Sequence, residues 1–446
     1  MSHIYCTQRC RIPTLPSSLS PLTHDGATVS DTPFDSLDFF RTDELTDDPY
    51  PYWDHLRGQC PITKEAHHDV FMVTGYDEAI AVYHDQVTFS NCISAIGPFA
   101  KFPVPLEGDD ITEIIETYRD DLPFSDQIPS FDPPKHTAHR GLLMRLITPK
   151  RLKENEAFLL QLAERQIDKF HARGECEFIS EYAGPYTLLV IADLLGVPED
   201  DHEEFLKNLT RHSDLTMSHK PLEYLYEQFT GYIEDRRRAP REDVMTGLAT
   251  ATFPDGSLPP VDDVMRIASN LFAAGQETTA RLLGTALQIL GDQPELQQRI
   301  RDDRSLIPAF IEETLRLESP IKGTFRLSRV PTVVHETEIP AGSTVMVLPS
   351  AANRDPKEFE QPGELRLDRQ NGRQHIAFGH GIHTCAGAPL ARAEANVSLQ
   401  RLLDRMDDIQ IAESHHGPAN DRHWAYSPTW MLRGHDELHL EFTPLN

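Results

Sequence analysis

Apolar residues recur at three- and four-residue spacing through the middle of the chain. Between about Lys150 and Leu317, four segments show this period: NEAFLLQLAERQIDKFHARG, GPYTLLVIADLLG, DHEEFLKNLTRH and PLEYLYEQFTGYIEDRRR. A repeat of this kind gathers apolar side chains on one face of a helix. We therefore predict that this region is mostly helical.

The segment between Pro260 and Gly291 predicts one unusually long helix. It contains no proline and keeps its apolar period throughout, so at 1.5 Å per residue it would extend roughly 45 Å and cross a whole domain. Its middle reads AAGQETT, where Gly275 weakens the helical ladder and Glu277 stands beside the hydroxyl of Thr278. A kink at this point would free backbone groups for water or a ligand.

Short β-branched runs punctuated by Gly and Pro predict strands at both ends of the chain. They lie within residues 69–76, 332–349 and 438–442, while residues 48–60 predict a short helix. The pattern indicates a mainly α protein with small β-sheets. Because no repeat or linker divides it, we predict a single domain over residues 35–446, preceded by a flexible tail over residues 1–34 that is rich in Ser, Thr and Pro.

The charge of the chain limits the partners it can bind. It carries 42 Lys and Arg against 70 Asp and Glu, a formal net charge of −28, which disfavours nucleic acid and anionic membranes. The sequence has no apolar run of the length that spans a bilayer, and its six cysteines lack the spacing of a disulfide framework. We expect a soluble, cytoplasmic protein.

One cysteine lies in an unusual setting, the segment FGHGIHTCAG over residues 378–387. A thiolate is a strong ligand for iron, and a cysteine-ligated haem needs backbone that can pass close to a flat macrocycle, as glycines allow. The helix expected to follow has Pro389 in its first turn, so its dipole would favour the thiolate of Cys385. The alternative is a structural cysteine in a glycine-rich turn.

The segment resembles the haem-binding pattern of the cytochrome P450 family, of the soluble bacterial type. Phe378, Gly381, His383, Cys385 and Gly387 match F-x-x-G-x-[RH]-x-C-x-G at every fixed position. The resemblance implies a cytochrome P450 fold, with the long central helix crossing a haem b (iron protoporphyrin IX). It also implies that Cys385 is the axial iron ligand, that Phe378 packs beside the sulfur, and that Gly379 and Gly387 line the haem.

Further motifs follow in the family's order. Glu313 and Arg316 form its E-x-x-R pair, which the three-residue spacing brings to one helix face. Arg369 falls where the third member of this structural network lies, although Leu365 replaces a usual phenylalanine. Taken alone, the spacing of Glu313 and Arg316 would also suit a solvated surface pair.

The resemblance also implies contacts to the haem propionates. The segment DPPKHTAHR, over residues 132–140, aligns His136 and Arg140 with contacting positions, and Arg326 and His383 fit the same role. A cationic donor beside a carboxylate makes a charge-assisted hydrogen bond. Each histidine could otherwise be an ordinary polar core residue.

On the distal side, residues 274–278 match the family's A/G-G-x-[D/E]-T motif. The resemblance implies that Ala274 and Gly275 border the haem, that Thr278 holds the oxygen ligand or its water, and that Glu277 relays protons during O2 activation. Soluble relatives often have Asp where Glu277 stands. Without the cysteine motif, these polar residues would be taken as a kink device.

We therefore expect a haem-thiolate monooxygenase, an oxidoreductase that hydroxylates a hydrophobic small molecule with O2. Electrons would come from a separate ferredoxin or flavodoxin-like donor with its reductase, because the chain is too short for a second redox domain. We expect a monomer that binds neither nucleic acid nor membrane. The donor should dock on a basic patch drawn from Arg145, Lys150, Arg151, Lys153, Arg373 and Arg392.

The substrate pocket is expected to be largely apolar. By position it draws on residues 93–106, 215–226 and 321–325, on Ala273 and Ala274, and on residues 429–431, with Lys322 as a cation that could meet a carboxylate or extend to solvent. Two alternatives remain open at this point. One is a peroxide-driven peroxygenase of the same fold, and the other is a non-catalytic haem protein that binds ligands; the Glu277–Thr278 pair counts against both.

Overall fold

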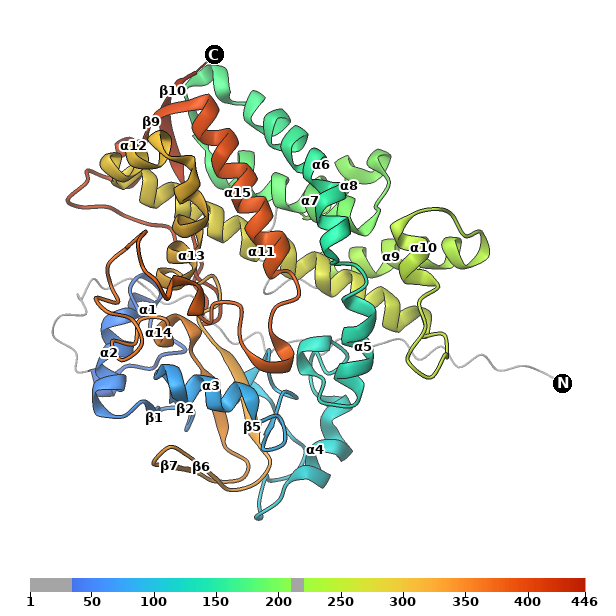
Figure 1. The fold of residues 1–446 in the computed structure, drawn as a ribbon. Helices are drawn as coiled ribbons and strands as arrows, with labels where there is room; N and C mark the ends of the chain where they lie inside the picture. The colour runs from blue at the N-terminus through green and yellow to red at the C-terminus, as the bar shows by residue number, and fades with distance from the viewer. Residues whose placement is uncertain (1–33, 210–219, 446) are drawn as a thin grey trace.

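The computed structural model describes residues 34–209 and 220–445, and within them the protein is mainly helical with small sheets. Helix α11 runs through the middle of the molecule (Figure 1). Helices α6, α7, α12 and α15 lie on one side of it, and the strands near the N-terminal helices lie on the other. The predicted tail over residues 1–34 falls outside the described part, except for Phe34, whose ring packs 6.2 Å from that of Tyr52.

The helices have the following bounds: α1 Glu44–Asp47, α2 Tyr50–Gln59, α3 Tyr76–His84, α4 Thr112–Tyr118, α5 Lys135–Leu143, α6 Pro149–Asp168, α7 Gly184–Leu195, α8 His202–Leu209, α9 Lys220–Arg238, α10 Val244–Ala249, α11 Val261–Asp292, α12 Pro294–Asp302, α13 Ile307–Leu317, α14 Pro349–Ala352, α15 Ala388–Arg405 and α16 Glu413–His416. None of the described helices is both long and apolar enough to span a membrane.

The strands are short: β1 Ile62–Lys64, β2 Phe71–Val73, β3 Phe89–Ser90, β4 Glu175–Glu177, β5 Thr324–Ser328, β6 Thr332–Val334, β7 Thr337–Ile339, β8 Thr344–Val347, β9 Met406–Ile411 and β10 His439–Pro444. They form sheets of order β1-β2-β8-β5-β3, β4-β10-β9 and β6-β7. In the first sheet, β2 pairs in parallel with β8, which places Phe71 opposite Val345. This pairing joins the N-terminal part of the chain to a segment more than half the chain away.

Helix α11 is the centre of the helical core. Its apolar face is buried up to Phe272 and again from Thr279 onward, and it contacts α7, α9 and α15. The expected kink at Gly275 is not a break, because the helix is continuous from Val261 to Asp292. A Cβ at Gly275 would lie 3.4 Å from Ile191 Cδ1 of α7, an ordinary van der Waals contact. The polar motif therefore lies on a helix that continues through it.

Some elements could not be read from the periodicity. The sequence patterns gave no helices at α3 and α4, which are only nine and seven residues long and offer too few turns for a clear repeat. Strand β4 interrupts the region predicted to be helical, and it exists because residues 175–177 pair with β10 near the C-terminus. Such pairing is set by tertiary contacts and leaves little local signal.

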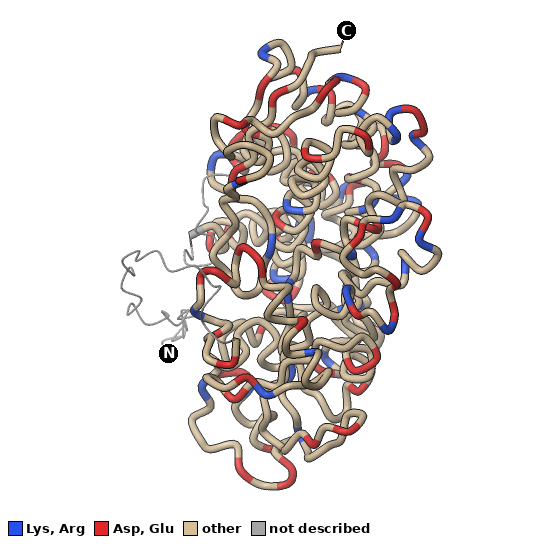
Figure 2. The backbone as a smooth tube through the Cα atoms, turned by 90° about the vertical axis from the view of Figure 1, so that its left-hand side faces the viewer, with Lys and Arg blue, Asp and Glu red and all other residues tan. Residues whose placement is uncertain are grey.

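Acidic and basic residues are interspersed from one end of the molecule to the other (Figure 2). Many of them are paired, as in the contacts of Arg405 with Glu164 and of Arg266 with Asp126. The excess of negative charge is thus spread over the surface and does not divide the protein into an acidic half and a basic half.

The core packing of α11 predicts the effect of truncating one of its side chains. Leu283 is fully buried in the main helical cluster, so Leu283→Ala should lower the free energy of unfolding by about 2–5 kcal/mol through lost transfer energy and a cavity. Val333→Ala, at an exposed position on β6, should change it by less than about 0.5 kcal/mol. Urea unfolding followed by circular dichroism compares the two; equal midpoints would contradict the central place of α11.

Candidate active site

The loop over residues 378–387 is closed by its own backbone and by the neighbouring helix α3. The Cys385 amide donates to the Phe378 carbonyl at 2.8 Å. Gly381 adopts φ +71°, and a Cβ there would lie 2.4 Å from the Tyr83 carbonyl oxygen. The requirement for glycine at this position therefore comes from the approach of α3, which corrects the expectation that this glycine serves the macrocycle alone. Gly379 also has positive φ, and no atom lies within 4 Å of its added Cβ.

Cys385 lies three residues before the first residue of α15, and the residue reaches solvent although many protein atoms surround it. Partial desolvation by these atoms raises the pKa of the thiol, and the Gly387 and Ala388 amides together with Arg140 and Arg392 lower it without cancelling that effect. The helix start does favour the thiolate, as expected, but for the free thiol burial is the larger influence. Beside the loop, the Arg392 guanidinium lies 4.6 Å from the centroid of the Phe378 ring.

Four cationic or polar donors from α5, β5 and the loop itself meet here. The rings of His136, on α5, and His383 lie 4.0 Å apart between centroids. Arg140 donates to the Thr384 carbonyl, and Arg326, on β5, is close enough to His383 to affect its titration. Burial, reinforced by these neighbouring cations, lowers the pKa of His383 to about 3, and burial followed by Arg140 lowers that of His136 to about 4.

Several of these donors have no acceptor within the described residues. Both ring nitrogens of buried His136 and Nε2 of His383 lack a hydrogen-bond partner, and the recorded hydrogen bond of the Arg326 guanidinium goes to the adjacent Phe325 carbonyl. Buried polar groups without partners are costly in native proteins. A group carrying two carboxylates would satisfy them, so the residues beside Cys385 fit a haem with its propionates.

The Glu313–Arg316 pair is buried, which excludes the solvated surface pair as its explanation. The guanidinium donates to both Glu313 oxygens, at 2.7 and 2.9 Å, and the two side chains are 2% and 0% exposed. Burial would raise the pKa of Glu313, but its hydrogen bonds to Arg316, to the Arg366 amide and to Arg369 lower it overall. The structure brings Arg369 to this pair: its Nε lies 3.1 Å from Glu313 Oε2.

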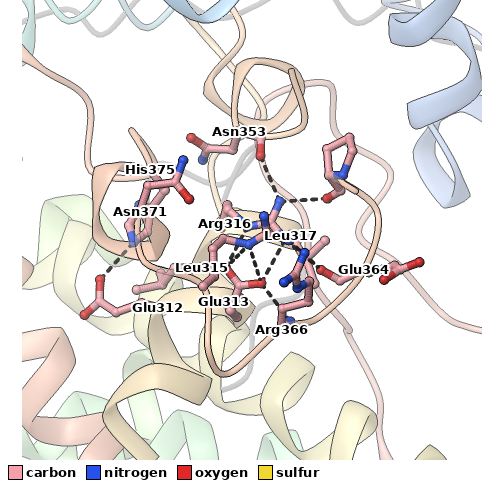
Figure 3. A network of polar contacts seen from close by, with 12 residues as sticks. Glu312, Glu313, Leu315, Arg316, Leu317, Asn353, Glu364, Arg366, Asn371 and His375 are labelled. Atoms are coloured by element: carbon pink, nitrogen blue, oxygen red, sulfur yellow. Dashed lines mark hydrogen bonds and ion pairs between the residues drawn. The ribbon is translucent and has the colours of Figure 1, made fainter. Parts of the chain in front are cut away.

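The remaining donors of Arg316 hold the segment that precedes the cysteine loop. They reach the carbonyls of Asn353, Pro362 and Glu364 at 2.7–3.0 Å (Figure 3). The Asn353 side chain then accepts from the Ile376 amide at 2.7 Å, two residues before Phe378. The ion pair on α13 is thus connected to the start of the loop by a continuous series of hydrogen bonds.

A second buried carboxylate supports the loop, and the sequence analysis did not find it. Glu312 lies 2.7 Å from Arg392 Nε and 3.0 Å from His375 Nε2. Although burial alone would raise the pKa of Glu312, these two partners lower it to about 2. Arg392 was expected in the docking patch; the structure instead places it between Glu312 and the Phe378 ring. Its partners are distant in sequence, so no local pattern could have indicated them.

The distal motif lies on α11, with Ala273 and Ala274 exposed. The Thr278 hydroxyl donates to the Ala274 carbonyl at 2.8 Å, one turn earlier. Glu277 Oε1 accepts a hydrogen bond from Arg281 at 2.5 Å. The sequence analysis overlooked Arg281, although its i,i+4 spacing from an acid could have indicated this ion pair.

The segments that were expected to line the substrate pocket are not uniformly apolar. Lys322 is 2% exposed and its ammonium donates to the Thr429 carbonyl at 2.8 Å, so it neither extends to solvent nor points a free cation into a pocket. Trp430 packs on Phe325 with ring centroids 5.0 Å apart. Of the expected stretch 215–226, residues 215–219 lie outside the described part of the chain, and α9 begins at residue 220.

Comparisons with known proteins agree with this geometry. A family model described as cytochrome P450 matches residues 255–410. Cytochrome P450 144 of Mycobacterium tuberculosis is 36% identical over 392 residues, covering 83% of this chain and 85% of its own. The substrate-free structure of Mycobacterium marinum cytochrome P450 CYP150A6 is 54% identical with a TM-score of 0.89, covering 93% of this chain and all of the other.

A more distant structure, Bacillus megaterium CYP109E1 in complex with testosterone, is 25% identical with a TM-score of 0.74 and covers 88% of this chain and 99% of its own. The Mycobacterium tuberculosis relative aligns with 83% of this chain, and the Mycobacterium marinum structure matches 93% of it. The chain therefore belongs to the cytochrome P450 family and is an oxygenase of that family.

Proposed function

We propose that this protein binds haem b through Cys385 and hydroxylates a hydrophobic small molecule, using O2 and electrons from a separate ferredoxin-type donor. The observation that carries the proposal is a pair of buried histidine rings beside the cysteine loop. Both ring nitrogens of His136 and Nε2 of His383 have no hydrogen-bond partner among the described residues, and Arg140 and Arg326 lie close to them, where two carboxylates would satisfy the group. Family membership supplies the reaction class.

Each residue of the site then has a role in holding the cofactor. Cys385 provides the axial sulfur, and the four donors hold the propionates by charge-assisted hydrogen bonds. Gly379 leaves open space beside the backbone, and Gly387 precedes the helix whose first amides face the sulfur. A thiolate-ligated haem, once bound, supplies O2 activation.

On the opposite face, this chain's contribution is the placement of protons and water. The Thr278 hydroxyl is anchored on the Ala274 carbonyl, so its oxygen remains available to accept a hydrogen bond from a water molecule. Glu277 stands next to it with a carboxylate held by Arg281. We assign proton supply to Glu277 and the positioning of water to Thr278.

The substrate class follows from the residues near the expected pocket. Ile93, Ile96, Phe325 and Trp430 are apolar, and Lys322 is engaged by a backbone carbonyl. A related structure holds testosterone, which supports a rigid, largely apolar molecule of similar size as substrate. The retained acid and hydroxyl favour a monooxygenase over a peroxygenase or a simple haem ligand-binding protein, because the latter two need no proton delivery to activate O2.

The electron donor would dock on cations that remain free at the surface. Lys153 and Arg373 are exposed, and Lys150 is exposed with only a long contact of 3.7 Å to Glu154. Arg151 is less available because it donates to the Leu194 carbonyl. Exposed cations of this kind steer an acidic partner at low ionic strength.

The ligand assignment predicts the outcome of replacing the cysteine. Reduced wild-type protein exposed to carbon monoxide should give the Soret band of a thiolate-bound haem, and Cys385→Ala should abolish it because no other thiol occupies the loop. The matched control is Cys60→Ala, at a partly buried position on the loop after α2, which should keep the band. A thiolate band in Cys385→Ala protein would remove Cys385 as the ligand.

The distal assignment predicts uncoupling when the hydroxyl is removed. The assay uses a hydrophobic compound chosen for the spectral shift it causes. Thr278→Ala should still consume NADH but release hydrogen peroxide in place of product, so that the ratio of peroxide to product rises about tenfold. Thr279→Ala, a buried position on the same helix, is the control. Product and peroxide are measured per NADH; unchanged coupling would exclude Thr278 from the proton path.

The buried ion pair predicts a defect in haem loading. Glu313→Gln leaves the fully buried Arg316 without its counter-charge, an imbalance that costs about 3–5 kcal/mol, so the purified protein should contain little haem. Glu364→Gln is a matched control, because Glu364 is exposed and offers Arg316 only its backbone carbonyl. The ratio of Soret to protein absorbance measures loading. Normal loading of Glu313→Gln protein would show that the pair does not support the loop.

A further inference from the structure

Arg281 links the distal acid to the C-terminal segment of the chain. It lies one helical turn after Glu277 on α11, is 7% exposed, and donates through Nη2 to Glu277 Oε1 at 2.5 Å. Residues four apart on a helix share a face, so the geometry of the pair is set by α11 itself. Glu277 is the more accessible partner, with 29% of its side chain exposed.

The guanidinium is also bound by residues about 150 positions later in the sequence. Nη2 also donates to Ser427 Oγ at 2.8 Å, and Nη1 donates to the Gly434 carbonyl at 3.1 Å. Ser427 in turn donates to Asp436. Gly434 has φ +151°, and a Cβ there would lie 2.6 Å from Arg281 Cγ, so the backbone packs directly on the arginine stem.

Between these attachment points lies the segment expected to border the substrate. Thr429 and Trp430 fall between Ser427 and Gly434 in the sequence, and Trp430 packs on Phe325 of the neighbouring strand. The Lys322 ammonium and amide bind the carbonyls of Thr429 and Met431. A displacement of this segment would therefore change the hydrogen bonds that Arg281 makes.

Arg281 is the cation that is bonded to Glu277. Lys322, His435 and the permanent cation Arg433 are the basic groups near Arg281, and Asp436 is the acid on the far side of Ser427. Burial, together with the nearby arginines, lowers the pKa of Lys322 to about 7 and that of His435 to about 3. A guanidinium remains charged throughout the working pH range.

We infer that Arg281 is a positioning residue for Glu277, which it holds in the orientation for proton delivery and connects through Ser427 and Gly434 to the segment over residues 427–434. This inference rests on the proposed function, because it assigns a role to the acid of the same site. Arg281 itself touches neither substrate nor cofactor in this arrangement. Its effect should appear in proton-dependent steps and be restored by another cation.

The test compares Arg281→Gln, Arg281→Lys and Arg266→Gln holoenzymes. Arg266 is a control on the same helix, about three turns away from Glu277, and it is paired with Asp126. Each protein is supplied with NADH through a ferredoxin and its reductase, together with a hydrophobic compound chosen for the spectral shift it causes, in H2O or D2O, and the rate of product formation is recorded. The C–O stretching band of the carbon monoxide complex reports the distal environment independently of any activity.

We expect Arg281→Gln to slow product formation by about tenfold and to raise the solvent isotope effect, because an unanchored acid makes proton delivery limiting. The C–O band should shift, and Arg281→Lys should recover at least half of the wild-type rate. Arg266→Gln should match the wild type in both measurements. If Arg281→Gln fails to load haem, Ser427→Ala, which removes one contact and keeps the charge, should show a smaller change in the same direction.

Two results would overturn the inference in distinguishable ways. Arg281→Gln or Ser427→Ala protein with the wild-type rate, isotope effect and C–O band would reject the positioning role alone. A wild-type protein without the thiolate band would reject the proposed function, and the inference with it. Slowing that Arg281→Lys does not relieve would show that the arginine serves packing rather than charge.

Discussion

The buried ion pair between Glu313 and Arg316 is the interaction on which the cysteine side of the molecule depends. Two opposite charges removed from water are tolerated only when all their hydrogen-bonding groups find partners. Here those partners are the Arg369 side chain and the carbonyls of residues 353, 362 and 364, so satisfying the pair fixes the path of the chain between α14 and the loop. The Asn353 side chain accepts a hydrogen bond from the Ile376 amide, which fixes the start of the loop that carries Cys385.

The distal side is also held in place by buried charged groups, here a different set of residues. Arg281 and Lys322 are nearly buried cations that bind carbonyls of the C-terminal segment, and Arg281 also holds Glu277. Because a buried cation without acceptors is costly, these contacts specify where the segment over residues 427–434 lies. The acid and the expected substrate boundary are therefore positioned by one set of charges, and neither is adjusted independently of the other.

Beside the cysteine loop lie two histidine rings for which the described residues supply too few hydrogen-bond partners. His136 and Arg326 are buried, and the fold brings them together with His383 and Arg140 from segments up to about 250 residues apart. Buried polar groups without partners are uncommon and call for an explanation. This arrangement bears on the proposed cofactor more directly than the cysteine does, because a lone thiol has many structural uses.

The sequence by itself determined the long helix, the strands near residues 71, 344 and 440, the Cys385 motif and the Glu313–Arg316 spacing, because each depends on contacts within a few residues. It did not determine the helices α3 and α4, the pairing of β4 with β10, or the close approach of the Tyr83 carbonyl to Gly381. It also proposed Arg392 for a docking surface and Lys322 for a pocket. Only the tertiary structure showed that Arg392 is paired with Glu312 while 35% of its side chain stays exposed, and that Lys322 is bound internally, since their acceptors lie 80 and 107 residues away along the chain.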